Sequence, residues 1–481
     1  MGDHSGDPAF REYQRRRREH WDLVAAWPEH ERAWGWHYHR ELARLYRNLV
    51  PPGARVLELG SAKGDLLAAL EPAYGLGVDL SGRMVEEARR RHPELHFLQA
   101  DLQEMELEGR FDFILLSDLV NDLWDVQAAF RRLLELTTPR TRIIINTYSR
   151  LWEFPLALAR KLKLCRPVLL QNWLTVEDLS NLLHLTGFEV LRAWPELLWP
   201  APPKLLARFC NRFLVRFFPF RHLALTNFLV ARPAPGAHPA PGPVKVSVIV
   251  PARNEAGNVP GLFHRTPEMG RGTELIFVEG GSRDGTYEAV QAALAEFPHR
   301  EAQLFRQTGR GKGDAVRLGF SKAGGEVLMI LDADMTVPPE DLPRFYDALV
   351  SGQGEFINGV RLVYPMEKEA MRFFNLLGNK FFSLMFTWLL GQPVKDTLCG
   401  TKVMWRQDYE RLAANRAYFG DFDPFGDFDL LFGAARLNLK IVEIPVRYRQ
   451  RTYGRTNIER WKHGWLLLKM VLFALRRVKF V

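Results

Sequence analysis

Residues 327–334 read VLMILDAD, an apolar run that passes directly into two aspartates separated by one alanine. An apolar run of this length is typical of a strand that is buried on both faces of a parallel sheet. Ligands of open α/β sheets bind at the carboxyl ends of the strands, so Asp332 and Asp334 lie where chemistry is expected. Two carboxylates spaced i, i+2 can hold one hard divalent cation against a diphosphate, which predicts an Mg²⁺ or Mn²⁺ site.

The same pattern of a short apolar run, then small polar residues, then a helical segment recurs along the chain. It opens the first half at residues 55–60 (RVLELG) and the second half at residues 246–251 (VSVIVP). Alternation of strands and helices predicts α/β folds with mostly parallel, doubly wound sheets. Further strands are expected at Gly77–Leu80, Phe113–Ser117, Ile143–Asn146, Glu274–Glu279 and Ile441–Val446.

A linker separates the two halves. Residues 233–243 read PAPGAHPAPGP, with seven Pro or Gly in eleven positions, which favours an extended and semi-rigid connection. We expect an N-terminal helical extension (1–34), a first α/β domain (35–231), the linker (232–244) and a second α/β domain (245–481) with a basic amphipathic tail.

Composition excludes several classes of protein. Of the 481 residues, 47% are hydrophobic and 25% charged, as in soluble globular proteins rather than disordered chains. Cys165, Cys210 and Cys399 lie far apart, so neither a disulfide framework nor a CxxC zinc site is expected. The longest uncharged run, residues 381–394, has 14 residues, whereas a membrane-spanning helix needs about 18–20. No apolar signal-peptide core follows the N-terminal arginines.

Positive charge gathers at the C-terminus. Residues 440–481 hold 11 Lys or Arg against two acids, an excess that equals the net charge of +9 for the whole chain. This excess predicts an anionic partner such as a membrane surface, although a solvated basic face remains an alternative. We expect the tail 465–481 to lie on anionic lipid. Nucleic acid is not expected as a partner, because no nucleic-acid-binding fold accompanies the charge.

The first half contains a nucleotide-like pocket. Glu58, Gly60 and Gly64 lie in ELGSAKG, between a predicted strand and a predicted helix, where glycines let backbone approach a ligand. Asp79 ends the next strand and can accept hydrogen bonds from both hydroxyls of a ribose. Asp101, in FLQAD after a third strand, could reach an adenine edge.

With VLELGSAKGDLL, GVDLSGRMVEEARRRHP, FLQAD and FDFILLSDLVNDLWD, residues 35–230 resemble the class I S-adenosylmethionine-dependent methyltransferases. The resemblance implies a Rossmann-like fold and S-adenosylmethionine as cofactor, although Ala62 stands where the family has the middle glycine. A degenerate, non-catalytic binding module is the alternative. Asp118, Asn121 and Asp122 follow the fourth strand and either contact substrate or cap the next helix.

The second half has further motifs around the two aspartates: VSVIVPARNE, ELIFVEGGSRDGT, GRGKGDAVRLG, DTLCGTKVMWR and FGDFDLLFGAARLNLKIVEIPVRY. In this order they resemble the family 2 glycosyltransferases, of the GT-A fold, and most closely the polyprenyl-phosphate sugar transferases. The resemblance implies that a nucleotide sugar is the donor. It assigns base and ribose to Pro251, Glu255 and Glu279, metal and diphosphate to the Asp332-Ala333-Asp334 triplet, and phosphates to Arg361 and Arg451.

The acceptor decides which residues are catalytic. A lipid phosphate is already an anionic nucleophile at neutral pH, because its second pKa is about 6, and it needs cations rather than a base. A glycan hydroxyl needs a positioned carboxylate, for which Asp396, Asp427 and Asp429 are the candidates. We expect an inverting transfer to a polyprenyl phosphate or other lipid-linked acceptor, on the cytoplasmic face of the membrane. A glycan hydroxyl is the alternative acceptor.

Two aromatic segments have two interpretations each. Residues 151–220 combine apolar and basic side chains, which suits either a helix at a membrane interface or a core helix with snorkelling Lys and Arg. Residues 373–391 read FFNLLGNKFFSLMFTWLLG and suit either a membrane-interface hairpin or a core helix.

Overall fold

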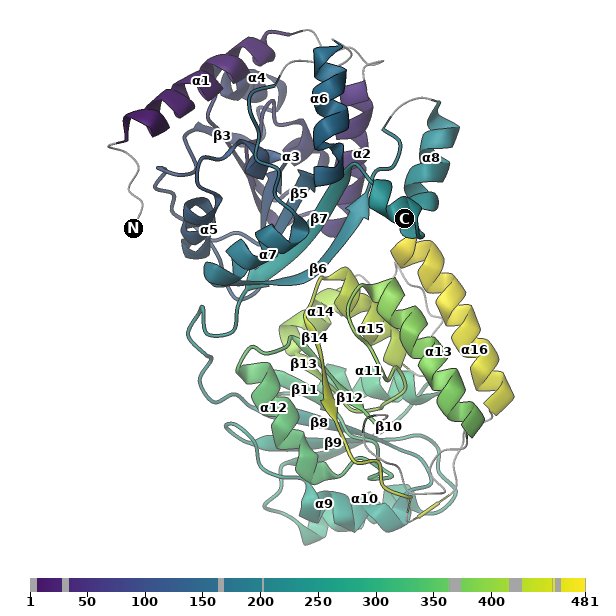
Figure 1. The fold of residues 1–481 in the computed structure, drawn as a ribbon. Coiled ribbons are helices and arrows are strands. Elements are labelled where there is room, and N and C mark those ends of the chain that lie inside the picture. Colours follow the sequence, from purple (N-terminus) through teal and green to yellow (C-terminus); the bar gives the residue numbers. More distant parts are fainter. Residues whose placement is uncertain are drawn as a thin grey trace. The chain divides into compact units, whose positions relative to one another are not determined.

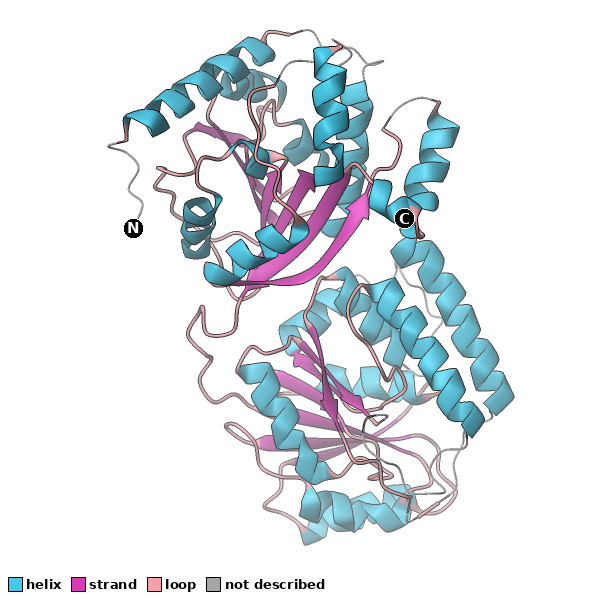
Figure 2. Ribbon diagram, in the orientation of Figure 1, coloured by secondary structure: helices cyan, strands magenta, loops and turns pink. Residues whose placement is uncertain are grey.

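The computed structural model describes residues 7–27, 34–162, 168–200, 203–361, 363, 373–414, 426–451, 453–454 and 460–480. The chain forms two compact units, Met1–His238 and Pro239–Val481. Each unit contains one seven-stranded sheet with helices packed against it (Figures 1 and 2). The predicted fold class, two α/β domains, is confirmed.

The first unit has the strand order β3-β2-β1-β4-β5-β7-β6, in which β1 to β5 are parallel and β6 and β7 run antiparallel. Its elements are α1 (Pro8–Ala25), α2 (Trp34–Leu49), β1 (Arg55–Leu59), α3 (Asp65–Ala69), β2 (Tyr74–Asp79), α4 (Gly82–Arg91), β3 (His96–Gln99), β4 (Phe113–Ser117), α5 (Val126–Glu135), β5 (Arg142–Tyr148), α6 (Glu153–Lys161), α7 (Val176–Leu185), β6 (Phe188–Glu196), α8 (Lys204–Arg212) and β7 (Thr226–Pro233).

The central strands of this unit are apolar on both sides because each side faces a separate core. Leu57 and Leu59 of β1 pack with α5 and α7, whereas Val56 packs on the other face with α2 and α4. Side chains alternate between the faces of a strand, so a continuous apolar run fills both cores. Polar side chains are therefore confined to the strand ends and the loops beyond them.

The second unit has the order β10-β9-β8-β11-β13-β12-β14, with β13 antiparallel to both of its neighbours. Its elements are β8 (Val246–Ala252), α9 (Val259–Arg265), β9 (Thr273–Glu279), α10 (Thr286–Glu296), β10 (Ala302–Arg306), α11 (Lys312–Lys322), β11 (Val327–Ile330), α12 (Leu342–Val350), β12 (Phe356–Val360), α13 (Phe373–Leu390), β13 (Lys402–Trp405), α14 (Arg406–Ala414), α15 (Asp427–Arg436), β14 (Ile441–Pro445) and α16 (Arg460–Ala474).

The C-terminal helix α16 is an integral part of the second unit. Its residues Met470, Val471 and Ala474 are buried in the same core as Phe386 and Leu389 of α13. The segment that was expected to lie on a surface therefore has one face buried in the protein core, and its other face is exposed to solvent. Among the described residues, no helix is long and apolar enough to cross a membrane.

The pair α13 and α16 presents large apolar side chains to solvent. Phe381 and Leu384 of α13 are exposed, as are Trp465 and Leu472 of α16, and Lys469 lies near the Trp465 ring. Helix α13 thus contributes to the core on one side and to an exposed apolar face on the other, and the membrane-interface interpretation of residues 373–391 stays a prediction.

Candidate active sites

In the first unit, the turn between β1 and α3 forms a cradle that requires its glycines. Gly60 and Gly64 have φ of 71° and 79°, in the left-handed region that favours glycine. A Cβ at Gly60 would lie 2.9 Å from Leu119 Cδ1, and one at Gly64 would lie 2.5 Å from Phe97 Cζ. At both predicted positions only glycine fits the backbone conformation and the space available, so the turn after β1 has no side chain at either position.

Asp79 holds this turn in place. Its Oδ2 accepts a hydrogen bond from the backbone N–H of Ala62 at 2.8 Å, and its Oδ1 accepts one from Ser81 N–H at 2.9 Å. Ala62 has a φ of 44°, a conformation that alanine adopts only when its surroundings impose it. Burial raises the pKa of Asp79, and the two backbone N–H groups lower it in part.

Two buried polar atoms beside this turn have no hydrogen-bond partner among the described residues. They are Oε2 of Glu58 and Oγ of Ser61, whose residues are 2% and 3% exposed. Burial also raises the pKa of Glu58 well above its ordinary value. An unpaired buried polar group costs about 1–3 kcal/mol, so these atoms suit a polar ligand in the cradle. The residues present fit the hydroxyls and amine of S-adenosylmethionine.

Helix α1 lies along the carboxyl ends of β2, β3 and β4. Gln14 Nε2 donates to Asp101 Oδ2 at 2.7 Å, and Asp22 Oδ1 accepts from the Ser81 hydroxyl. Arg17 forms an ion pair with Asp122. Asp101 also accepts from the backbone N–H of Gln103, so both of its oxygens already have partners in this state.

Asp118 forms a polar cluster just beyond β4. Tyr38 Oη donates to the carboxylate at 3.0 Å, and Asn146 Nδ2 donates to Oδ1 at 2.7 Å. Burial raises the pKa of Asp118 to about 7, although both donors oppose this. Asp118 does not cap α5, because the cap is Asp125. Sequence patterns did not identify Tyr38 and Asn146, which come from distant elements.

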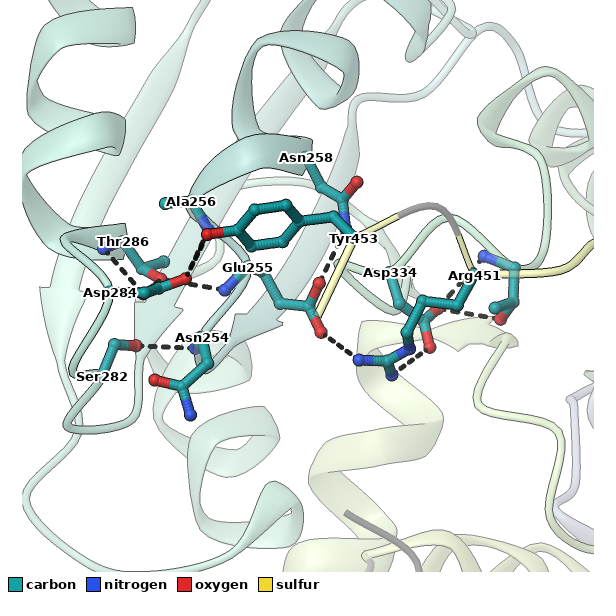
Figure 3. Close-up of polar contacts among 11 residues, drawn as sticks. Asn254, Glu255, Ala256, Asn258, Ser282, Asp284, Thr286, Asp334, Arg451 and Tyr453 are labelled. Carbon is teal, nitrogen blue, oxygen red and sulfur yellow. Dashed lines mark hydrogen bonds and ion pairs between the residues drawn. The ribbon is translucent and has the colours of Figure 1, made fainter. Parts of the chain in front are cut away.

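In the second unit, Glu255 lies beyond β8 and is tied to both neighbouring loops. Its backbone N–H donates to Thr286 Oγ1, and its carboxylate accepts from Asn258 Nδ2 at 2.7 Å and from Arg451 Nη1 at 2.8 Å (Figure 3). Burial raises the pKa of Glu255, and Arg451 lowers it in part. Pro251, in β8, precedes this group by four residues.

The two aspartates after β11 both pair with cations. Asp332 Oδ1 lies 2.5 Å from Lys312 Nζ, and Asp334 Oδ2 accepts from Arg451 Nη2 at 2.7 Å. Burial alone would raise the pKa of Asp332, but Lys312, together with the charges of Lys402 and Arg361, outweighs it and the pKa is lowered. Ala333, between them, is buried in the core.

These carboxylates fit a hard divalent cation, because such ions prefer oxygen ligands and each aspartate already lies beside a positively charged side chain. No group of three or more His, Cys, Asp or Glu suited to a metal occurs among the described residues. The two aspartates would therefore supply only part of a coordination sphere, as is usual for Mg²⁺ bound with a substrate diphosphate.

The segment after β14 closes over the ends of β8 and β9. Arg451 joins Glu255 to Asp334, and Tyr453 Oη donates to Asp284 Oδ2 at 3.1 Å (Figure 3). A Cβ at Gly257 would lie 2.5 Å from the Tyr453 ring, so glycine is needed for this approach. Arg451 thus lies beside Glu255 and Asp334, and the role of these three residues in donor binding stays a prediction.

Glu279 ends β9 and accepts from the backbone N–H of Ser282, so its carboxylate stabilises the following turn. Its side chain is 6% exposed.

Asp396 is bound by Arg361 rather than left open for proton transfer. The guanidinium donates through Nε at 2.7 Å and Nη2 at 2.8 Å, and the backbone N–H of Arg361 donates as well. This pairing lowers the pKa of Asp396 despite its burial. Asp429 is buried in the first turn of α15. Asp427 begins α15, and its side chain lies outside what the structure describes.

Two family models match the chain. Residues 34–193 match a methyltransferase domain, and residues 247–412 match Glycosyl transferase family 2. The dolichol-phosphate mannosyltransferase of Pyrococcus furiosus is 29% identical over 49% of this chain and 67% of its own length. That of Saccharomyces cerevisiae is 40% identical over 22% of this chain and 41% of its own.

The undecaprenyl-phosphate 4-deoxy-4-formamido-L-arabinose transferase of Pseudomonas aeruginosa is 34% identical over 22% of this chain and 33% of its own length. The chain therefore spans less than half of two of these three relatives.

Among solved structures, glucosyl-3-phosphoglycerate synthase of Mycobacterium tuberculosis matches 49% of this chain and 80% of its own (20% identity, TM-score 0.38). An S-adenosylmethionine-dependent methyltransferase of Mesorhizobium loti matches 42% of this chain and 98% of its own (21% identity, TM-score 0.32). The family matches confirm both resemblances seen in the sequence: the chain joins a methyltransferase domain to a glycosyltransferase domain of family 2.

Proposed function

We propose that the second unit transfers a sugar from a nucleotide sugar to a polyprenyl phosphate, in a metal-dependent reaction that inverts the anomeric carbon. The observation that carries this proposal is the contact of Arg451 with both Glu255 and Asp334. One guanidinium thereby links the candidate nucleoside-binding residue to the candidate diphosphate site, at the ends of two strands.

Each residue of this site has a role set by its charge. Pro251, Glu255 and Glu279 hold the base and ribose, and Asp332 and Asp334 hold the metal. A divalent cation, when bound, neutralises charge on the departing diphosphate. Lys312 and Arg451 currently neutralise the two aspartates, so they are positioned to turn to phosphate oxygens instead. The acceptor oxygen attacks from the opposite side of the sugar, which inverts the configuration.

A phosphate acceptor agrees best with the state of the candidate bases. Asp396 is occupied by a bidentate ion pair, and its pKa is lowered, so it is a poor proton acceptor. A phosphate monoester needs no base, since it is largely ionised at neutral pH. The names of the similar transferases, which include dolichol phosphate and undecaprenyl phosphate, support the same acceptor class.

The exposed apolar face of α13 and α16 supports a lipid carrier. Phe381, Leu384, Trp465 and Leu472 would enter the interface of a bilayer, where aromatic side chains are favoured. Lys469 and Arg476 on α16 and the short π-helix that follows it, residues 475–479, suit anionic headgroups. We therefore propose that this unit works peripherally at the cytoplasmic face of a membrane.

For the first unit we propose S-adenosylmethionine-dependent methyl transfer. Glu58, Gly60, Gly64, Asp79 and Asp101 would bind the cofactor, which supplies the methyl group. Asp118, with Tyr38, would face the methyl acceptor, because it follows the strand beside β1.

Metal binding provides the first test. We expect Asp334→Asn to weaken Mn²⁺ binding at least tenfold in the presence of a nucleoside diphosphate, measured by calorimetry, and to reduce sugar transfer by 10²-fold or more. The exposed Asp347→Asn, on α12, is the matched control. Full activity of the wild type in excess chelator would contradict the metal requirement.

The acceptor class is tested by Arg451 and Asp429. With a polyprenyl phosphate acceptor, Arg451→Gln should lose at least 10²-fold in kcat/KM, because a charge-assisted contact to phosphate is removed. Asp429→Asn should keep activity within about tenfold. Arg271→Gln, a surface arginine, serves as the control. A glycan hydroxyl acceptor predicts the reverse order, with Asp429→Asn inactive and a rate that rises with pH.

Cofactor binding tests the first unit. Asp79→Asn should weaken the binding of S-adenosylmethionine, because it removes one or two charge-assisted hydrogen bonds worth about 1.5–3 kcal/mol each. A calorimetric titration measures this loss. Asp65→Asn, which replaces a more exposed carboxylate on α3, should bind like the wild type. If the wild type itself binds no cofactor at millimolar concentration, the first unit is a non-catalytic module.

The raised pKa of Asp118 predicts a pH-dependent stability. Between about pH 4 and pH 7 the folded state retains a proton that the unfolded state has lost, so stability falls as pH rises through this window. Asp118→Asn removes this loss. We expect the free energy of unfolding of the variant, measured by urea unfolding and expressed relative to wild type, to be at least about 1 kcal/mol higher at pH 8 than at pH 4.5. The exposed Glu108→Gln should show no such gain, and an equal difference at both pH values would contradict the assignment.

A further inference from the structure

A second exposed apolar surface lies on the first unit, in residues 203–223, which contain α8 and the turns η3 (Leu214–Arg216) and η4 (Phe220–Leu223). Leu205 and Phe218 are 81% and 79% exposed. Exposure of this extent is unusual for several neighbouring large apolar residues in a soluble monomer. The other exposed members are Leu206, Phe209, Phe213, Phe217, Phe220 and Leu223.

The outward direction of these side chains is fixed by the opposite face of the segment. Asn211 accepts from the backbone N–H of Trp199 at 2.7 Å and donates to its carbonyl at 2.9 Å. Cys210 and Val215 are buried, and Arg216 pairs with the buried Glu196. The segment is therefore anchored through its polar and small residues and presents its aromatic residues to solvent, the reverse of an ordinary surface helix.

The charge of this surface indicates what it binds. Residues 203–223 contain five Lys or Arg and no Asp or Glu. Arg216 is engaged with Glu196, whereas Lys204, Arg208 and Arg221 are exposed among the apolar side chains. Exposed aromatic and leucine side chains interspersed with basic residues, without any acid, match the headgroup region of an anionic bilayer.

Helix α6 extends the same kind of surface. Trp152, the residue before α6, donates its indole N–H to the carbonyl of Leu223 in η4 at 3.1 Å. Phe154 and Leu158 are exposed on α6, and Lys161 lies at its end. Exposed apolar residues therefore occur on both sides of this contact.

We propose that residues 203–223 and α6 form a membrane-binding surface through which the methyltransferase unit attaches to anionic lipid bilayers. This attachment is separate from any contribution of α13 and α16, which belong to the second unit. Of the two sequence interpretations of residues 151–220, the proposal adopts the interfacial one for residues 203–223 and α6.

The test measures sedimentation of the full-length protein with vesicles of phosphatidylcholine, alone or mixed with phosphatidylglycerol. The apolar variant Leu205→Ser/Phe209→Ser/Phe218→Ser should lose at least tenfold in affinity for the mixed vesicles. The control Leu23→Ser/Leu185→Ser changes exposed leucines on α1 and α7 and should bind like the wild type. Circular dichroism melts verify that all variants fold.

Charge is tested independently at exposed positions that do not affect the core. Lys204→Gln/Arg208→Gln/Arg221→Gln should weaken binding to the mixed vesicles on the order of 10²-fold at low salt, since each basic residue near such a surface contributes about fivefold. Binding to phosphatidylcholine alone should change little.

Two outcomes would overturn the proposal. In the first, both variants bind as the wild type does while Phe381→Ser/Leu384→Ser/Trp465→Ser abolishes binding, which would assign all attachment to the second unit. In the second, light scattering shows that the apolar variant converts a dimer to a monomer with vesicle binding unchanged. The surface would then join two copies of the chain.

Discussion

Burial of both faces of each sheet decides where this protein can place polar chemistry. The central strands supply side chains to two cores at once, as Val56 and Leu57 do in β1, so most positions along them are apolar. Carboxylates therefore appear at the carboxyl ends of strands, where the chain leaves the cores. Asp79, Asp118 and Asp332 all occupy such positions, in two units with different strand orders.

The same constraint explains why strands and acidic residues could be predicted from sequence. Apolar runs located β1, β4, β8 and β11 to within a residue or two. A parallel strand that is buried on both faces is apolar at nearly every position, so it is visible in the sequence as a continuous apolar run. The antiparallel pair β6 and β7 was not predicted. These strands are separated by α8 and its turns, so their pairing depends on contacts that local sequence does not encode.

Side-chain partners were harder to predict than positions. Asp396 looked like a possible base, yet Arg361, 35 residues earlier, occupies both of its oxygens. Asp118 was recognised, but Tyr38 and Asn146 come from a helix and a strand on either side of it in sequence. The C-terminal helix was predicted to be basic and amphipathic. That its apolar face belongs to the core followed only from its packing against α13.

The two sites also differ in how their buried charge is balanced, and this difference bears on how each would bind a ligand. In the second unit, Lys312 and Arg451 neutralise Asp332 and Asp334, so a metal and a diphosphate must exchange with pairs that already exist. Such an exchange costs little net electrostatic energy, because cations remain next to carboxylates and anions next to cations throughout. In the first unit, Glu58 and Ser61 keep buried oxygens without partners among the described residues. A ligand that supplies hydrogen-bond donors there relieves an existing cost, which favours binding from the outset. Donor binding in the second unit is therefore expected to involve rearrangement of the segment that carries Arg451, whereas the first unit's cradle is already formed.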